Sequence, residues 1–232
     1  MRSSTWRAAG NAYVVVEADG EPLDAARAVE LAAGVDGVLE ILSMDGPLVE
    51  IAIWNPDGSR AEISGNGTRI AAAWLAERTG ATEVHVRVGE RLVAAVLGEH
   101  GVVRQDLGPV LVGPSETVEG VTFTPVSVGN PHAVVMGDPA EIGRIGPLLE
   151  RHPHFPNRTN VQVARIDGRG EVTARVWERG VGETASSGTS AVAVAAASFG
   201  AGEVVVHFPG GDLRVVLEDG QATLFGSAER VA

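Results

Sequence analysis

The sequence predicts an α+β protein of two pseudo-symmetric domains, each a mainly antiparallel sheet around a central helix. Three features carry this prediction: Gly-Asn turns that lead into strands, Ser-Gly pairs that open helices, and strand pairs broken by Gly-containing turns. Each feature occurs twice, and the three follow the same order in both halves of the chain. Self-similarity of this kind indicates an internal duplication.

The Gly-Asn turns are the first repeated feature. GNAYVVV, beginning at Gly10, and GNPHAVV, beginning at Gly129, each place a Gly-Asn pair two or three residues before a run of β-branched residues. Such a turn followed by a β-branched run is typical of the start of a strand. We therefore expect equivalent strands in the two halves.

The Ser-Gly pairs are the second repeated feature. Each follows an apolar strand that ends in Trp (IAIW or ARVW), at the same spacing from 54 to 64 and from 177 to 187. A Gly-bearing turn lies in between, and a run of small residues comes after. The pattern predicts helices through Ile70–Ala76 and Ala191–Ala197, opened at Ser64 and Ser187.

The third repeated feature is a pair of predicted hairpins over residues 83–97 and 203–217. Both segments alternate apolar and polar residues with period 2 and break at a Gly-containing turn. The halves then join near Gly108–Ser115, which gives predicted domains of residues 1–112 and 113–232. Two similar domains most naturally face each other, and a cleft between domains is a usual place for a small-molecule site.

Composition excludes several classes of function. The 232 residues contain no Cys and no Lys, which removes thiol catalysis, Cys-ligated metals and a Schiff-base lysine for pyridoxal phosphate. The net charge of −12 argues against nucleic acid as a partner. The six His show no metal-binding spacing, and no apolar run has membrane length. We expect a cytoplasmic protein that acts on a small molecule without metal, cofactor or membrane.

The two predicted helix starts can hold an anion. The first turn of a helix has N–H groups outside the helical ladder and the positive end of the helix dipole. A carboxylate held there would have its α-carbon flanked by Ser64 and Ser187, so that one side chain removes a proton and the other returns it. The alternative for each Ser alone is a simple helix cap. The backbone donors would come from Gly65, Asn66, Gly67, Gly188 and Thr189.

Other polar residues lie beside these turns in the sequence. Arg179 suits bidentate pairing with a carboxylate, with a surface ion pair as the alternative. His132 and Glu178 suit orienting or deprotonating a hydroxyl, with a core or turn histidine as the alternative for His132. Four Asn residues suit substrate contacts: Asn11, Asn55, Asn130 and Asn160. For Asn11, Asn130 and Asn160 the alternative is turn chemistry.

Taken together, the motifs resemble diaminopimelate epimerase. They are GNAYVVV, WNPDGSRAEISGNGTR, GNPHAVV, FPNRTNVQ, WERGVGETASSGTSAVA and FPGGDLRV, and they come in the family's order over nearly the whole chain. The resemblance implies two pseudo-symmetric α/β domains, no cofactor, and a homodimer. It also implies interconversion of LL- and meso-diaminopimelate in lysine and cell-wall synthesis.

The resemblance carries roles onto individual positions. Ser64 and Ser187 stand where the family has its two catalytic cysteines. His132 and Glu178 stand where it has residues that assist each thiol. Two backbone pairs, Gly65-Asn66 and Gly188-Thr189, would hold the reacting carboxylate. The rest of the substrate would be bound by Asn11, Asn55, Asn130, Asn160 and Arg179.

Two departures from the family pattern bear on activity. The first is Ser in place of both cysteines. A thiol has a reference pKa of about 8.5, whereas a serine hydroxyl needs a strong adjacent base before it can accept a proton from the substrate. In VDGVL, Gly37 replaces the family's Gln, which removes one substrate contact. Three interpretations follow: a Cys-to-Ser form of an epimerase, a natural Ser-type isomerase or dehydratase acting on another amino acid, or a non-catalytic amino-acid-binding homologue.

Overall fold

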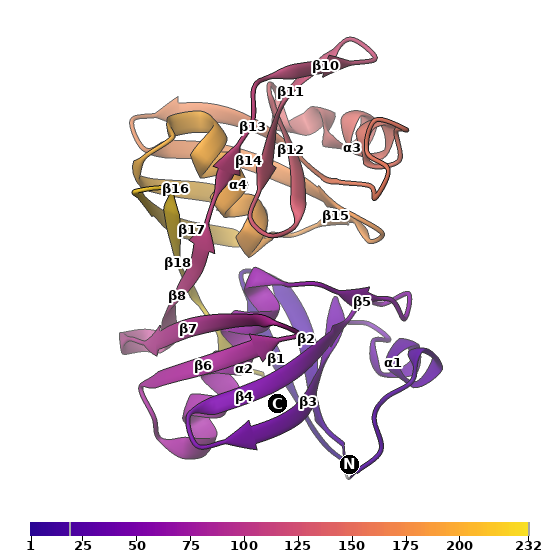
Figure 1. The fold of residues 1–232 in the computed structure, drawn as a ribbon, viewed down its shortest axis with the longest axis vertical. Helices are drawn as coiled ribbons and strands as arrows, with labels where there is room; N and C mark the ends of the chain where they lie inside the picture. The colour runs from indigo at the N-terminus through magenta and orange to yellow at the C-terminus, as the bar shows by residue number, and fades with distance from the viewer. Residues whose placement is uncertain (19, 232) are drawn as a thin grey trace. The chain divides into compact units, whose positions relative to one another are not determined.

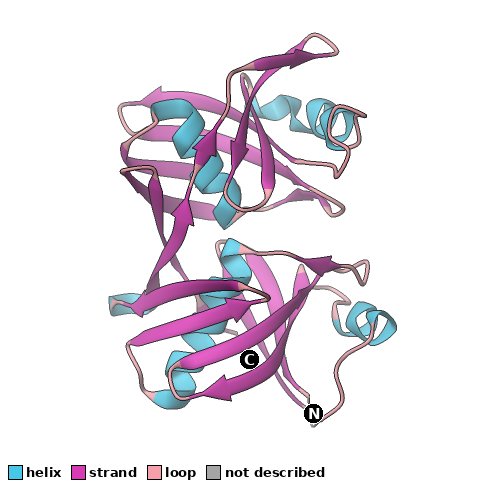
Figure 2. Cartoon of the chain, in the orientation of Figure 1, coloured by secondary structure: helices cyan, strands magenta, loops and turns pink. Residues whose placement is uncertain are grey.

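The computed structural model describes residues 1–18 and 20–231, and its chain divides into two compact units. Unit 1 comprises Met1–Asp106 together with the chain from Phe225 onward, and unit 2 comprises Leu107–Leu224. Strands predominate over helices in both units (Figure 2). No helix in the described part of the chain is long and apolar enough to span a membrane.

The unit boundaries differ from the sequence-based division at 112/113 in two ways: unit 1 ends at Asp106, and it also includes the C-terminal segment. The last strand, β19 (Glu229–Arg230), pairs with β1 (Arg2–Ala8) through Trp6 and Arg230. Backbone pairing therefore assigns the C-terminal segment to unit 1, although it follows unit 2 in sequence. The chain passes from one unit to the other within β8 (Val102–Pro109) and again within β18 (Gln221–Ser227).

Unit 1 has one sheet with both parallel and antiparallel neighbours (Figure 1). Strand β2 pairs parallel with β3, β3 antiparallel with β4, β4 parallel with β6, and β6 antiparallel with β7. The short β5 pairs with the end of β4. The bounds are β2 Asn11–Glu17, β3 Gly37–Asp45, β4 Leu48–Trp54, β5 Arg60–Ala61, β6 Glu83–Val88 and β7 Arg91–Leu97.

Unit 2 repeats this order and these directions. Strand β12 pairs parallel with β13, β13 antiparallel with β14, β14 parallel with β16, and β16 antiparallel with β17. The short β15 pairs with the end of β14. The bounds are β9 Leu111–Val112, β10 Glu116–Val118, β11 Val121–Ser127, β12 Pro131–Met136, β13 Asn160–Gly168, β14 Glu171–Glu178, β15 Gly182–Thr184, β16 Gly202–Phe208 and β17 Gly211–Glu218.

The duplication extends to strand register. Trp54 pairs with Val38 in unit 1, and Trp177 pairs with Val161 in unit 2. Each strand pair also has one irregularity in register, after Ile41 in unit 1 and after Ile166 in unit 2, although these two places are not equivalent. Register is specified by which face of a strand is buried, so agreement at this level reflects a repeated core. The predicted α+β fold of two duplicated halves is confirmed.

A buried helix lies in the core of each unit. Helix α2 (Gly65–Thr79) packs against the strands of unit 1, and α4 (Gly188–Phe199) packs against those of unit 2. Every residue from Gly65 to Leu75 and from Gly188 to Ala196 is buried. Burial on all sides favours small and apolar residues, which explains the Ala-rich composition of both segments, and the buried polar residues of α2 lie near its start.

The remaining helices cover the crossovers. Helix α1 (Ala25–Leu31) connects β2 to β3, and α3 (Ile142–Glu150) connects β12 to β13. Short 3-10 turns occur at Glu99–Gly101 and Pro139–Glu141. The sequence patterns did not predict α3, because Gly143, Gly146 and Pro147 interrupt it. Apolar packing of Ile142, Ile145 and Leu149 in the unit 2 core stabilises it nonetheless.

Candidate active site

The two Ser-Gly helix starts form as predicted, but their hydroxyls have different partners. Both Ser64 and Ser187 are extended N-cap residues. Ser64 Oγ accepts a hydrogen bond from the Gly67 N–H at 3.0 Å, so it does cap α2. Ser187 makes no side-chain capping bond and is 5% exposed. Capping thus explains the Ser64 hydroxyl in part and does not explain the Ser187 hydroxyl.

The surroundings of Ser64 in unit 1 include residues that the sequence analysis did not assign. Tyr13 Oη lies 3.2 Å from Ser64 Oγ. Asn66 accepts a hydrogen bond through Oδ1 from Arg69 Nη2 at 2.6 Å. The Asn66 side chain is therefore engaged by a neighbouring guanidinium, and the part of Asn66 that suits a ligand is its backbone N–H in the first turn of α2.

Arg69 is fully buried beneath this turn. Its Nε donates to the backbone carbonyl of Ser227 at 3.1 Å, and its Nη1 is a buried atom with no hydrogen-bond partner. Burial lowers the pKa of Arg69 to about 10, and the neighbouring Tyr13 opposes this shift. The guanidinium remains a cation at neutral pH, which adds positive charge near the start of α2.

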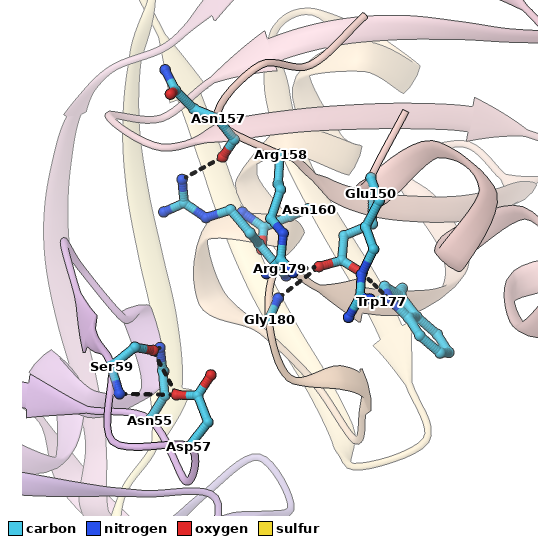
Figure 3. A network of polar contacts seen from close by, with 11 residues as sticks. Asn55, Asp57, Ser59, Glu150, Asn157, Arg158, Asn160, Trp177, Arg179 and Gly180 are labelled. Carbon is cyan, nitrogen blue, oxygen red and sulfur yellow. Dashed lines mark hydrogen bonds and ion pairs between the residues drawn. The ribbon is translucent and has the colours of Figure 1, made fainter. Parts of the chain in front are cut away.

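The other two unit 1 candidates occupy turns. Asn11 is buried and begins β2, where it pairs with Ala8 across the turn. Asn55 Nδ2 donates to Ser59 Oγ at 2.9 Å, and its backbone N–H donates to the Ser59 carbonyl at the same distance. Figure 3 shows this second turn, in which Ser59 also bonds to Asp57. Turn chemistry accounts for the observed Asn55 contacts.

In unit 2, His132 lies in a buried chain of polar groups. Its Nε2 is 2.9 Å from Asn130 Oδ1, and its Nδ1 is 3.0 Å from the amide nitrogen of Gln162. The chain continues into the first turn of α4, since Gln162 reaches Ser190 Oγ at 2.9 Å and Asn130 reaches Thr189 Oγ1 at 3.3 Å. His132 therefore supports the helix that begins at Ser187.

Burial controls the charge of His132. It lowers the pKa of the imidazole from 6.5 to about 3, and the nearby Arg179 guanidinium adds to the decrease. The ring is neutral at physiological pH. With Gln162 donating to Nδ1, the proton lies on Nε2 and is directed at Asn130. Both ring nitrogens of His132 are therefore hydrogen-bonded within the core, as expected for the alternative in which it is a buried core histidine.

Asn160, Arg179 and Asn157 form a second polar group in unit 2 (Figure 3). Asn160 Oδ1 accepts from the Arg179 backbone N–H at 2.9 Å, and Asn160 Nδ2 donates to the Pro131 carbonyl at 2.9 Å. The Arg179 guanidinium donates to the Asn157 carbonyl at 3.2 Å. The Asn160 side chain thus ties the Gly-Asn turn of unit 2 to the turn that carries Arg179.

Glu178 is anchored to the segment that precedes Ser187. Its carboxylate accepts from the Thr184 hydroxyl at 2.6 Å, and Thr184 is buried. Thr184 lies at the end of β15, three positions before Ser187. The sequence offered no signal for Thr184, because the pairing depends on β14 and β15 lying side by side.

A buried glutamate holds each of the two strand-ending tryptophans. Glu40 accepts from Trp54 Nε1 at 2.9 Å, and Glu150 accepts from Trp177 Nε1 at 3.2 Å. Glu150 also accepts from the Gly180 N–H at 2.9 Å, as Figure 3 shows. These bonds fix the turns that follow each Trp. Among the described residues, no group of three or more His, Cys, Asp or Glu is placed to hold a metal ion.

Solved structures with the same fold span the whole chain. A predicted epimerase from Pseudomonas aeruginosa superposes with a TM-score of 0.78 at 19% identity, covering 100% of this chain and 97% of that one. A hydroxyproline epimerase from Agrobacterium vitis, with bound trans-4-hydroxy-L-proline, gives 0.74 at 17% identity, covering 99% and 89%. At these identities the likeness shows a shared fold.

Sequence relatives give the class and then the family. The diaminopimelate epimerases that this chain matches in sequence place it in the class of isomerases of the epimerase type. The diaminopimelate epimerase of Desulforudis audaxviator is 37% identical over 96% of this chain and 94% of its own length. That of Thermobifida fusca is 39% identical over 100% and 96%. The family model for diaminopimelate epimerase matches residues 124–231. The chain belongs to the diaminopimelate epimerase family.

Proposed function

We propose that this protein inverts the configuration of the α-carbon of diaminopimelate or a closely similar amino acid by a two-base mechanism. Ser64 and Ser187 are the two proton-transferring groups. One oxygen, in its deprotonated form, takes the α-proton while the other, as a hydroxyl, delivers a proton to the opposite face, so the carbon inverts and the two oxygens exchange protonation states. The observation that carries this proposal is that each unit begins its buried helix with the same Ser-Gly pair.

The helix starts supply the electrostatic part of the proposal. Backbone N–H groups of Gly65 and Asn66, and of Gly188 and Thr189, bind the reacting carboxylate. Charge that develops on this carboxylate as the proton leaves is stabilised by both helix dipoles. Gly at the first position of each helix leaves the backbone open to close approach.

The other candidate residues have two kinds of role. Glu178 and His132 position the Ser187 helix start, Glu178 through Thr184 and His132 through the Asn130 and Gln162 bonds to α4. Arg179 supplies a cation for the substrate's distal carboxylate. The distal amino-acid end is bound with the help of Asn11, Asn55, Asn130 and Asn160.

A natural Ser-type isomerase for another amino acid is the second candidate, and Gly37 is the observation that favours it. The backbone there is crowded, since an added Cβ would lie 2.7 Å from the Trp54 carbonyl oxygen. A longer side chain at position 37 is therefore excluded without rearrangement. The contact that the family makes with Gln is absent, which changes how a diaminopimelate-length substrate is held.

Exchange of the α-proton with solvent tests both candidates. The purified protein is incubated in D2O with LL-diaminopimelate, meso-diaminopimelate and a panel of shorter amino acids, and deuterium uptake is followed by mass spectrometry. Uptake into diaminopimelate supports the first candidate, and uptake only into another amino acid supports the second. The Ser64→Ala/Ser187→Ala variant serves as the negative control.

A Ser64→Cys/Ser187→Cys variant measures the effect of the oxygen atoms. A thiol loses its proton far more readily than a hydroxyl, so this variant should exchange the α-proton faster than the parent. Calorimetry with diaminopimelate separates binding from turnover. Binding without exchange in either form would show a non-catalytic binding protein and would remove the proposed reaction.

The family resemblance also implies a cytoplasmic homodimer, and we propose that assembly for this chain. Light scattering coupled to size-exclusion chromatography should then give twice the monomer mass. A monomer mass at micromolar concentration would contradict the proposed dimer.

A further inference from the structure

Tyr13 connects Ser64 and Gly37, two of the positions at which this sequence departs from its family. Its phenol lies 3.2 Å from the Ser64 hydroxyl, and its backbone pairs with Gly37 on the neighbouring parallel strand. Tyr13 is 7% exposed and is the only tyrosine in the chain. The departures at positions 37 and 64 are therefore not independent, because both residues are neighbours of one buried aromatic ring.

Gly37 provides the space that this ring occupies. A Cβ at position 37 would lie 2.8 Å from Tyr13 Cε1 and 3.2 Å from Cδ1. Real Cβ atoms essentially never approach a ring so closely, so a side chain at 37 would displace Tyr13. The loss of the family's Gln is thereby linked to the presence of a phenol beside Ser64.

The hydrogen-bond geometry leaves the Ser64 proton available to Tyr13. Ser64 Oγ already accepts the Gly67 N–H at 3.0 Å. A hydroxyl has one hydrogen to donate, and Tyr13 Oη at 3.2 Å can receive it. Proton transfer between the two oxygens then needs no movement of the backbone.

Arg69 adds the charge that this arrangement needs. It is 0% exposed, it interacts electrostatically with Tyr13, and its Nη1 has no hydrogen-bond partner. An uncompensated buried cation favours an anion nearby. Tyr13 can supply this anion, because its phenol can ionise and it interacts electrostatically with Arg69.

We propose that Tyr13 is a positioning residue and proton acceptor for Ser64. Gly37 leaves the space that the Tyr13 ring occupies, and the Arg69 cation stabilises the phenolate form of Tyr13. The inference rests on the proposed function. As Ser64 Oγ takes the α-proton of the substrate, its own proton passes to the Tyr13 phenolate. The C–H bond breaks, a neutral phenol and a neutral hydroxyl result, and the electron pair remains on the carboxylate-stabilised carbon. The Ser–Tyr pair thus replaces the low-pKa thiol of the family.

Kinetics of the Tyr13→Phe variant form the first test. The variant keeps the ring and removes Oη, so the exchange rate constant should fall about a hundredfold or more, the usual contribution of general base catalysis. KM should stay within about twofold, because in this proposal Tyr13 acts through Ser64 and does not bind the substrate. The parent's exchange rate should rise at alkaline pH as the Tyr13 phenol ionises, and this rise should be absent in Tyr13→Phe.

Rescue by a thiol separates proton transfer from a structural effect. In the Tyr13→Phe background, Ser64→Cys should restore exchange, since a thiolate forms without a neighbouring phenolate. Failure of this double variant to recover, with normal folding by circular dichroism, would overturn the proposal. So would an unchanged rate for Tyr13→Phe.

A direct titration of Tyr13 tests its coupling to Ser64 even if the protein turns over no substrate. The single tyrosine makes the ultraviolet absorbance of tyrosinate a specific report on Tyr13. Ser64→Ala should raise its titration midpoint, because the hydroxyl that donates to the phenolate is lost. Ser187→Ala is the matched control and should leave the midpoint unchanged. An identical midpoint in the parent and Ser64→Ala would exclude the coupling, whereas absence of exchange in the parent alone would count against the proposed function only.

Discussion

The side-chain amide nitrogen of Gln162 donates to Nδ1 of His132 at 3.0 Å, inside the core of unit 2. His132 is buried and Gln162 is fully buried, and the same amide also reaches Ser190 in the first turn of α4. The bond holds a neutral imidazole under the helix that begins at Ser187. Two predictions come from this relationship, one for pH and one for packing.

The first prediction concerns stability in acid. The pKa of His132 falls from 6.5 to about 3 on folding, so the unfolded chain binds a proton that the folded chain refuses. The stabilisation is fully present above pH 6.5 and is lost as the pH falls from 6.5 towards 3, with a slope of up to about 1.4 kcal/mol per pH unit. Urea unfolding across this range measures it.

The matched control for this prediction is an exposed histidine. His132→Asn should flatten the pH dependence of the free energy of unfolding between pH 6.5 and 4, although it lowers stability at pH 7. His100→Asn changes a residue at φ 55 that Asn tolerates, and it should keep the parent's slope. Equal slopes in the parent and His132→Asn would show that His132 does not carry the effect.

The second prediction uses the duplication as its guide. Leu39 in unit 1 stands where Gln162 stands in unit 2, and Gly67 stands where Ser190 stands, with the Leu39 side chain close to Gly67. Gln162→Leu alone should cost about 1–3 kcal/mol, because it strands polar groups on His132 and Ser190. Adding Ser190→Gly recreates the unit 1 pair and removes one stranded hydroxyl.

A double-mutant cycle measures this coupling. The two substitutions together should be less harmful than the sum of the single changes by about 0.5–3 kcal/mol, as expected for residues in contact. Chemical denaturation of the four proteins gives the value. Strict additivity would mean that Gln162 and Ser190 do not share their interaction.

Local features of the site could be predicted from sequence, and contacts between distant residues could not. The Gly-Asn turns require positive φ at Gly10 and Gly129, which the structure shows at 81° and 90°. The helix starts and both hairpins likewise depend on neighbouring residues, and all are confirmed. By contrast, Tyr13 and Ser64 lie 51 positions apart, and their contact depends on how β2 and α2 pack.

The two tryptophans, Trp54 and Trp177, show the same difference between local features and contacts of distant residues. Their equivalence was visible from spacing alone, but their glutamate partners are not equivalent. Glu40 lies on β3, whereas Glu150 ends the helix α3. A buried indole N–H needs an acceptor, and any nearby element can supply it. The sequence therefore indicates that each Trp has a partner without indicating which one.

The third prediction follows from the difference between the two serines. Ser64→Ala removes the cap bond to Gly67 and should lower the free energy of unfolding by about 1 kcal/mol. Ser187→Ala removes no capping bond and should cost less. Thermal or urea unfolding of the two variants checks this. A larger loss for Ser187→Ala would reveal a structural bond at Ser187 that matters more than the cap at Ser64.

The fourth prediction compares two glycines on α3. An added Cβ at Gly146 would lie 2.6 Å from both Cβ and Cγ of Trp177, whereas nothing lies within 4 Å of one at Gly143. Gly146→Ala should therefore cost about 1–3 kcal/mol through overpacking. Gly143→Ala should be neutral or stabilising by about 0.5 kcal/mol, because Ala is the better helix residue.

Gly146→Ala should also disturb the site, since Trp177 directly precedes Glu178 and Arg179. If it displaces the indole from Glu150, the turn at Gly180 loses its anchor to the same carboxylate. Tryptophan fluorescence and near-ultraviolet circular dichroism should change in this variant, and substrate affinity should fall with them. Gly143→Ala, on the same helix, should leave spectra and affinity at parental values. A Gly146→Ala protein with parental stability and spectra would show that α3 shifts to accommodate the methyl group, and that the Trp177–Glu150 bond does not depend on Gly at 146.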